Sequence, residues 1–217
     1  MLLFELTHPT LRLALVRAGS VQASVAGAAL LAELTHAEQR VRSDPSVFSE
    51  PVRVAVRDVL RVGGYKPTGR GKPASELLLA MALKEGLPRI GNLVEINNLV
   101  SLESALPSSI FDARRLGSVL ALRFGRAGES YVFNAAGHSM SLEGLPVVCR
   151  GPEREPVGNA VRDSMLTKVD ASTNSVLAVL YGSRVLPESV LQGAADRLAA
   201  LLSEHAHAQR VSVSFAP

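Results

Sequence analysis

The run Val94-Glu95-Ile96-Asn97-Asn98-Leu99-Val100-Ser101-Leu102, followed by Pro107-Ser108-Ser109-Ile110-Phe111-Asp112, is the stretch from which the fold can be inferred. The first run is predicted to be helical, and it carries two adjacent carboxamides, Asn97 and Asn98, among apolar residues. A carboxamide in such a setting either satisfies backbone groups or faces a pocket. Neither run is a short catalytic motif, so its meaning depends on the surrounding sequence.

A basic segment precedes this stretch. Between residues 51 and 72 there are six cations and one acid, Asp58, which gives a local net charge of +5. The first three cations recur every four residues on a predicted helix face, and the others lie in the following loop. The six are Arg53, Arg57, Arg61, Lys66, Arg70 and Lys72. Such a patch suits contact with nucleic-acid phosphates, and the alternative is a solvated helix face followed by a polar loop.

The sequence contains no motif for metal binding or for covalent catalysis. Its five histidines and its single cysteine, Cys149, do not have metal-ligand spacing, and one thiol excludes internal disulfides. The run Gly69-Arg70-Gly71-Lys72 lacks the spacing of a nucleotide-hydrolase phosphate loop. His138, in a predicted turn, is the candidate functional histidine, although a turn histidine is usually a surface residue. We expect no metal and no cofactor.

Composition indicates a globular protein with a substantial apolar core. The chain has 217 residues, of which 47% are hydrophobic and 20% charged, with a net charge of +3. No uncharged apolar run approaches the roughly 18 residues of a membrane span, and the N-terminus lacks the basic region of a signal peptide. We therefore expect a cytoplasmic protein without a membrane partner.

Apolar periodicity predicts one mixed α/β domain, of the α+β type, over residues 1–217. Helices are expected over residues 24–42, 49–63, 75–86, 94–103 and 187–206. Strands are expected over residues 2–6, 11–16, 119–124, 131–134, 145–149, 176–181 and 211–215. Ser24 and Ser49 are the expected caps of the first two helices. The architecture expected is a mixed sheet flanked by helices, with residues 187–217 forming a C-terminal helix and strand.

Taken in order, these motifs resemble the B3/B4 domain of the phenylalanyl-tRNA synthetase beta subunit, the module that proofreads mischarged tRNA. The two runs that open this section resemble its pattern valine-aspartate-x-x-asparagine, then proline-x-histidine-x-phenylalanine-aspartate. Later parts of its pattern resemble Arg123 with Gly128-Glu129, and Thr167-Lys168-Val169 with Thr173-Asn174. The resemblance covers roughly residues 50–182. It is closer still to free-standing members, through Lys72-Pro73-Ala74-Ser75-Glu76, Asn98 to Leu102 and Arg162-Asp163-Ser164.

The resemblance implies a pocket for an aminoacyl group. Asn98 would donate to the oxyanion, and Glu129 would orient water or bind the α-amino group. The remaining pocket positions would be Glu95, Pro107, Ser109, Asp112, His138, Gly158 and Lys168. Ser109 and Lys168 stand where the family has a histidine and a glutamate. The pocket is therefore expected to have a selectivity other than tyrosine proofreading.

Three functions follow as hypotheses. The first is a stand-alone editing or tRNA-binding domain that hydrolyses misacylated tRNA in trans, with the basic segment contacting tRNA or aminoacyl-tRNA. This would be an aminoacyl-tRNA deacylase and not a complete synthetase. The alternative is a non-catalytic binding module for a free amino acid or small metabolite. A third is a synthetase partner that docks through the helix at 187–206, although the favoured interpretation of this helix is that it covers the sheet. The sequence leaves open the amino acid, the tRNA and whether a homo-oligomer forms.

Overall fold

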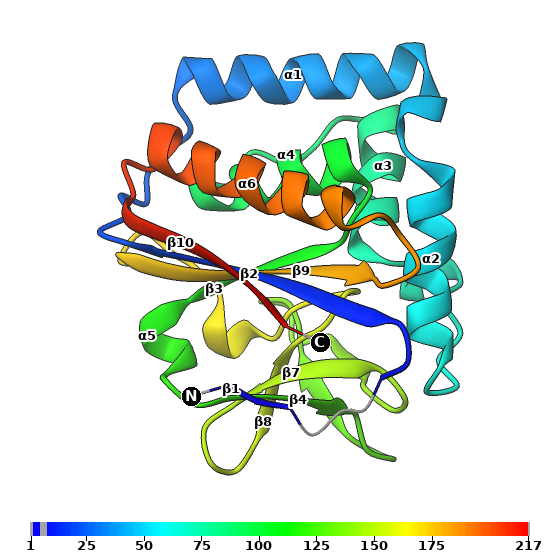
Figure 1. Ribbon diagram of the computed structural model, residues 1–217. Helices are drawn as coiled ribbons and strands as arrows, with labels where there is room; N and C mark the ends of the chain where they lie inside the picture. The colour runs from blue at the N-terminus through cyan, green and yellow to red at the C-terminus, as the bar shows by residue number, and fades with distance from the viewer. Residues whose placement is uncertain (1, 5–7, 217) are drawn as a thin grey trace.

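The fold is built in layers, with helices above one sheet and a second sheet below it (Figure 1). The computed structural model describes residues 2–4 and 8–216. Its strands are β1 Leu2–Phe4, β2 Leu11–Gly19, β3 Ser108–Asp112, β4 Leu120–Phe124, β5 Ser130–Val132, β6 Ser139–Ser141, β7 Pro146–Arg150, β8 Glu155–Gly158, β9 Ser175–Ser183 and β10 Gln209–Ala216. Its α-helices are α1 Ala28–Ser43, α2 Glu50–Arg61, α3 Ala74–Lys84, α4 Asn92–Ser104, α5 Ala113–Leu116 and α6 Glu188–His205. Short 3₁₀ helices are η1 Pro45–Val47, η2 Gly69–Gly71 and η3 Met165–Thr167.

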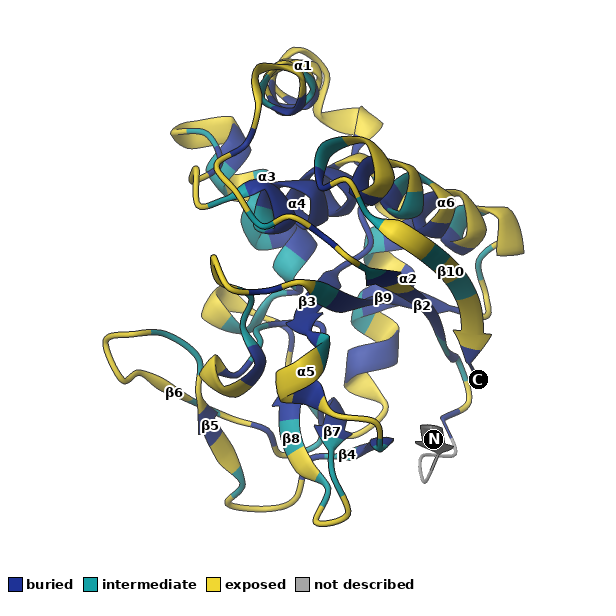
Figure 2. Cartoon of the chain, turned by 90° about the vertical axis from the view of Figure 1, so that its left-hand side faces the viewer, coloured by how far each residue is buried: buried dark blue, intermediate teal, exposed yellow. Residues whose placement is uncertain are grey.

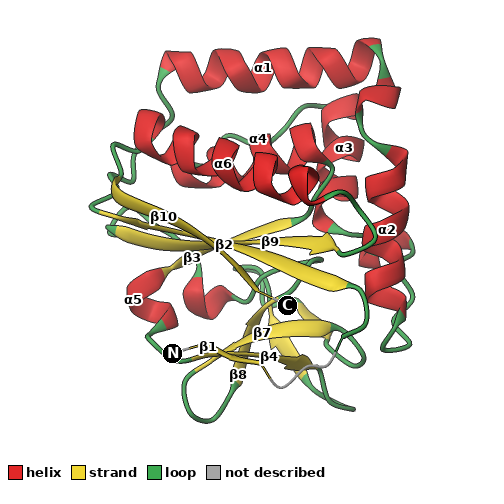
Figure 3. Ribbon diagram, in the orientation of Figure 1, coloured by secondary structure: helices red, strands yellow, loops and turns green. Residues whose placement is uncertain are grey.

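The strands divide among three sheets. The upper sheet has the order β10-β2-β9-β3 and is antiparallel throughout. The lower sheet has the order β1-β4-β7-β8, in which only the β1–β4 pair is parallel. A separate two-stranded sheet joins β5 to β6. Figure 3 shows α2 running down one side, from the helical layer towards the lower sheet.

Strand β9 lies between two cores, and this explains its apolar sequence. Its residues Val176, Ala178 and Leu180 face the helices, in a core shared with α1, α4 and α6. Leu177 and Val179 face the lower sheet, in the second core. Because successive side chains point to opposite faces of a strand, a strand buried on both faces needs apolar residues at every position. The uninterrupted run predicted as a strand is therefore the central strand of the fold.

The mixed α/β class is confirmed, and most predicted elements are present with shifted ends. Helix α2 begins as predicted, because Ser49 Oγ accepts a hydrogen bond from Val52 N at 3.5 Å. The predicted cap of α1 is wrong: the helix begins at Ala28, after Gly27. Ser24 is engaged elsewhere, since its backbone carbonyl accepts from Asn92 N and its N–H donates to Asn92 Oδ1. The predicted strand at 2–6 falls partly on residues 5–7, which lie outside the described residues.

Three strands and one short helix were not predicted from the sequence. They are β3, β6, β8 and α5, each of three to five residues. Segments this short carry too little periodicity to be recognised alone. The strands form because neighbouring strands provide hydrogen-bond partners, whereas α5 begins at Asp112, whose side chain accepts from Arg114 N and Arg115 N. Among the described residues, no helix combines the length and apolar character needed to cross a bilayer.

Candidate functional site

Three predicted pocket positions converge on a carboxyl group that was not among the predicted site residues. Ser109 is the second residue of β3, Gly158 ends β8, and Lys168 follows η3. Ser109 Oγ donates to Asp163 Oδ1 at 2.6 Å and lies 3.0 Å from the hydroxyl of Tyr181 on β9. Lys168 is close enough for its charge to act on Asp163. We call Ser109, Asp163, Lys168 and Tyr181 the Asp163 cluster.

Gly158 is required by the close packing of this cluster. A Cβ atom at position 158 would lie 2.4 Å from Phe111 Cζ and 2.6 Å from Asp163 Oδ1. Both distances are far below van der Waals contact, and neither the buried phenylalanine ring nor the bonded carboxyl can move away freely. The glycine therefore lets β8 approach the cluster, which places its backbone beside the Asp163 carboxyl.

The carboxyl of Asp163 is held in an environment that favours its neutral form. Burial raises its pKa to about 7, against opposing effects from the Ser109 hydrogen bond and the Lys168 charge. Burial likewise lowers the pKa of Lys168, and the charge of Asp163 opposes that shift. Lys168 Nζ donates to the carbonyl of Phe133 at 2.6 Å. A carboxyl that titrates near neutral pH can accept and release a proton under working conditions.

A second set of hydrogen bonds fixes the segment that carries Asp163. Asn159 Nδ2 donates to the Tyr131 hydroxyl at 2.6 Å, and Asn159 Oδ1 accepts from the backbone N–H groups of Val161 and Arg162. The Tyr131 hydroxyl in turn donates to the carbonyl of Arg162. Burial raises the pKa of Tyr131 well above its usual range, so this hydroxyl stays protonated and can donate. The backbone on either side of Asp163 is thus held in place before any ligand binds.

Arg162 connects this segment to the basic loop. Its Nη1 donates to the carbonyl of Arg70 at 2.7 Å, and the nearby Ala74 N donates to Ala160 O at 2.8 Å. The guanidinium also lies 4.9 Å from the ring centroid of Phe133. The loop that was predicted to bind phosphate therefore lies directly beside the Asp163 cluster.

Two other predicted acids lie outside the cluster, and their carboxylates are fully engaged. Asp112 Oδ1 accepts from the N–H groups of Arg114 and Arg115 at the start of α5, and Oδ2 accepts from Thr173 Oγ1 at 2.8 Å. Glu129 accepts from Arg123 through both oxygens, at 2.6 and 2.8 Å. The Arg123 hydrogen bonds are the main reason that the pKa of Glu129 lies below its usual value.

The remaining predicted pocket residues lie around α4 or in a surface turn. Glu95 Oε1 accepts from Ile90 N at 3.1 Å, and its buried Oε2 has no hydrogen-bond partner among the described residues. Burial raises the pKa of this carboxyl. Asn98 is buried on α4, and the backbone carbonyl of buried Pro107 accepts from Tyr181 N. His138 is exposed and stacks against Phe133.

The six predicted phosphate-binding cations fall into two groups. The three on α2 each have an acidic partner: Arg53 pairs with Glu50, Arg57 with Glu76, and Arg61 with Asp58. Glu50 and Glu76 lie just outside the 51–72 window, so the local charge was overestimated. Within the described residues, the loop cations Lys66, Arg70 and Lys72 have no ion pair. The loop, more than the helix face, is therefore available to bind an anion.

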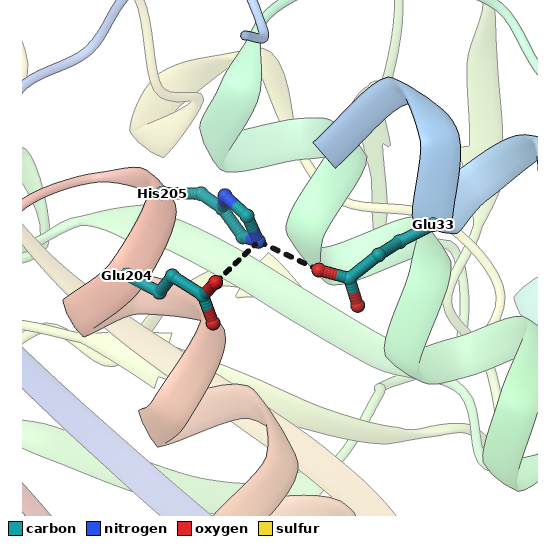
Figure 4. A group of neighbouring side chains, drawn as sticks. All are labelled: Glu33, Glu204 and His205. Carbon is teal, nitrogen blue, oxygen red and sulfur yellow. Dashed lines mark hydrogen bonds and ion pairs between the residues drawn. The ribbon is translucent and has the colours of Figure 1, made fainter. Parts of the chain in front are cut away.

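Glu33, Glu204 and His205 form a group whose ligand atoms could approach one metal ion (Figure 4). His205 Nε2 lies 2.8 Å from Glu33 Oε1 and 3.9 Å from Glu204 Oε1. The other oxygen of Glu33 already accepts from Arg197. A guanidinium at this position neutralises the carboxylate that a cation would need, so we interpret the group as an ionic link between α1 and α6.

The family model for the B3/4 domain matches residues 66–207. This chain belongs to the B3/4 domain family. A solved structure that matches part of the chain is an N-terminal fragment of the phenylalanyl-tRNA synthetase beta subunit from Pyrococcus horikoshii. It is 11% identical, with a TM-score of 0.45, and the match covers 56% of this chain and 40% of the fragment. No curated protein matches the sequence. The predicted resemblance to the B3/B4 family is confirmed.

Sequence reasoning missed the central residue of this B3/4 domain's candidate site. Asp163 lies in Arg162-Asp163-Ser164, a run that resembles free-standing members, but nothing in the run marks its carboxyl as a site residue. A further signal was the scarcity of aromatics, because the chain has only three tyrosines and two of them, Tyr131 and Tyr181, are buried around Asp163. A buried tyrosine needs a partner for its hydroxyl, so these residues mark where polar groups enter the core.

Proposed function

We propose that this B3/4 domain binds the aminoacylated end of a tRNA and hydrolyses its ester bond at the Asp163 cluster. The observation that carries the proposal is the convergence of Ser109, Gly158 and Lys168, which the family resemblance predicted as pocket residues, on a carboxyl with a pKa of about 7. An aminoacyl ester is already activated. A site for its hydrolysis must place the carbonyl, orient water, accept a proton and stabilise the oxyanion.

Asp163 supplies the proton acceptor in this scheme. Its carboxylate takes a proton from a water molecule as the water oxygen attacks the ester carbonyl carbon. The tetrahedral intermediate then collapses, the bond from carbon to the ribose oxygen breaks, and the proton passes to that oxygen. The products are the free amino acid and the tRNA. The sequence predicted that Glu129 orients water or binds the α-amino group, but both of its oxygens are bound to Arg123, so Asp163 is the proposed group that acts on water.

Lys168 and Ser109 support this step. The ammonium of Lys168 lies near Asp163 and can stabilise negative charge on the substrate carbonyl oxygen. The Ser109 hydroxyl holds Asp163 Oδ1 at 2.6 Å, and the backbone of Asn159 also bonds this carboxyl, so the base is held in one orientation. Asn98, the predicted oxyanion donor, lies on α4, and no contact between described residues joins it to the Asp163 cluster. A domain acting on charged tRNA in trans would work in the cytoplasm, where its substrate is made.

The test is release of label from a panel of tRNAs, each charged with a non-cognate radiolabelled amino acid. We expect release from one or two pairs. Asp163→Asn should lower that rate by about 10²- to 10⁴-fold, the usual contribution of a general base. Asp196→Asn, which changes an exposed acid on α6, is the matched control and should leave the rate unchanged. Full activity in Asp163→Asn would rule out the assigned role.

A second candidate function is supported by the hydrogen bonds within the cluster itself. Ser109 and Asp163 bind one another and Lys168 binds Phe133 O, an arrangement that suits a rigid binding site as well as a catalytic one. If no charged tRNA is hydrolysed but one free amino acid raises the melting temperature, the domain is a non-catalytic binding module. Loss of that stabilisation in Asp163→Asn would locate the binding site.

A further inference from the structure

Next to Asp163, the Arg162 side chain contacts both the backbone of the basic loop and the ring of Phe133, which stacks with His138. We propose that the basic loop and these side chains form a binding site for single-stranded RNA, in which the loop cations hold phosphates and the aromatic rings stack with a base. We call this the loop–stack surface, and it consists of Lys66, Arg70, Lys72, Phe133, His138 and Arg162. The choice of RNA rests on the proposed function; the site itself rests on the contacts below.

The phosphate-binding part is the loop between α2 and α3. Lys66 and Arg70 are exposed, Lys72 is half-buried, and none of the three has an ion pair among the described residues. The loop is ordered by its own contacts, since the Tyr65 hydroxyl donates to Gly71 O at 3.1 Å and Arg162 Nη1 donates to Arg70 O. Cations on an ordered loop lose little conformational freedom on binding a phosphate, so the site is prepared for an anion.

The base-stacking part is the pair formed by Phe133 and His138. Their ring centroids are 6.2 Å apart with an angle of 27° between planes, and the Arg162 guanidinium lies 4.9 Å from the Phe133 centroid. Figure 2 shows that the loop between β5 and β6, which carries both rings, is largely exposed. Bases of any kind stack on such rings and on guanidinium planes, so this part predicts little sequence preference.

The stack is held in place by its own backbone. Phe133 N donates to His138 O at 3.0 Å, and Asn134 Oδ1 accepts from His138 N at 3.0 Å. Asn134 Nδ2 also lies 3.0 Å from His138 Nδ1, which fixes the imidazole ring. The Phe133 carbonyl accepts from Lys168 of the Asp163 cluster. A base on the stack would therefore lie near the proposed catalytic carboxyl, because only Lys168 stands between the Phe133 backbone and Asp163.

A single strand fits this surface better than a duplex. In a duplex the bases are stacked inside and cannot reach an aromatic side chain, so only the phosphates would bind. In a single strand or an unpaired end, each base can leave its neighbours at little cost. The combination of free cations and a prepared stack therefore favours an unpaired RNA segment.

The experiment measures fluorescence anisotropy of labelled RNA with the full chain. One probe is a single-stranded oligonucleotide of about twelve nucleotides, within the range that a single-strand site covers. The others are its blunt duplex and a strand with abasic nucleotides. We expect the wild type to bind the single strand most tightly, with an affinity that falls as salt rises.

Two variants separate the two parts of the surface. His138→Ala should weaken binding of the single strand about fivefold or more and leave binding of the abasic strand unchanged. Arg70→Gln should weaken binding of both strands. It should also reduce the slope of log affinity against log salt concentration by about one, as expected for the loss of one phosphate contact. Arg40→Gln, an exposed arginine on α1, is the matched control and should change nothing. Unchanged melting temperatures would establish that each variant is folded.

Equal affinity for duplex and single strand, or no effect of His138→Ala on single-strand binding, would overturn the proposal. Its failure is distinguishable from failure of the proposed function. Ester hydrolysis without single-strand binding would contradict only the loop–stack surface. Single-strand binding that needs His138, in a protein that hydrolyses no charged tRNA, would support the surface and contradict only the deacylase.

Discussion

Asp163 and Glu129 are both carboxylates of the lower half of the molecule, yet their surroundings are opposite. Glu129 faces the guanidinium of Arg123 and its pKa lies below the usual value. Asp163 is half-buried and held by the Ser109 hydroxyl, and its desolvation raises its pKa to about 7. A cationic hydrogen-bond partner therefore keeps one carboxylate charged and structural, while burial with a neutral partner leaves the other able to exchange protons.

The largest expected effect concerns the pH dependence of stability. An aspartate in the unfolded chain ionises near pH 4, but Asp163 in the folded protein stays protonated up to about pH 7. The folded state thus binds more protons between these values, and its stability falls as pH rises from about 4 to 7. By linkage the loss is up to about 4 kcal/mol. Asp163→Asn cannot ionise and should avoid this loss.

The measurement is urea unfolding of both proteins at pH 5 and pH 8. The stability of Asp163→Asn relative to wild type should increase at the higher pH. A difference between the two proteins that stays constant with pH would mean that Asp163 does not have a raised pKa.

The next prediction concerns Glu129, the carboxylate that is paired with an arginine. Glu129→Gln removes the negative charge that faces Arg123, whose side chain is only 9% exposed, and should lower stability on the order of 2 to 3 kcal/mol at pH 7. Glu143→Gln, at an exposed site, should change it by less than about 0.5 kcal/mol. Chemical denaturation compares the two. A stable Glu129→Gln protein that has lost all deacylase activity would instead indicate a catalytic Glu129.

Packing around Asp163 is tested by Gly158→Ala. The added methyl would overlap Phe111 and the Asp163 carboxyl, and overpacking of this kind costs about 1 to 3 kcal/mol. The control is Gly193→Ala on α6, where nothing lies within 4 Å of the new atom. Because alanine favours the helix, this change should stabilise by about 0.5 to 1 kcal/mol. Melting temperatures that shift in the same direction would contradict the close packing at position 158.

The smallest effects are expected on the surface of α2. Arg61 pairs with Asp58 where both side chains are more than half exposed, so Arg61→Ala should cost less than about 0.5 kcal/mol. Arg57 binds both oxygens of Glu76, whose side chain is 6% exposed, so Arg57→Ala should cost more, about 1 to 2 kcal/mol. Equal costs by urea unfolding would mean that burial of Glu76 does not strengthen the pair.

Much of the fold follows from local patterns. The Ser49 cap, the amphipathic C-terminal helix and the apolar strand at 176–181 were all read from neighbouring residues. Strand β3 could not be recognised, because its five residues read Ser-Ser-Ile-Phe-Asp and form a strand only beside β9. The partner of Arg57 could not be recognised from the local sequence either, since Glu76 lies on another helix.

The sequence by itself determined the family, the order of the main elements and the identity of several residues that reach the site. Tertiary structure decided which of them act together. Ser109, Gly158 and Asp163 are up to 54 residues apart, and only the packing of β3 and β8 brings them into contact. The raised pKa of Asp163 is also a tertiary property, because desolvation of a carboxyl depends on everything that folds around it and not on its neighbours in the chain.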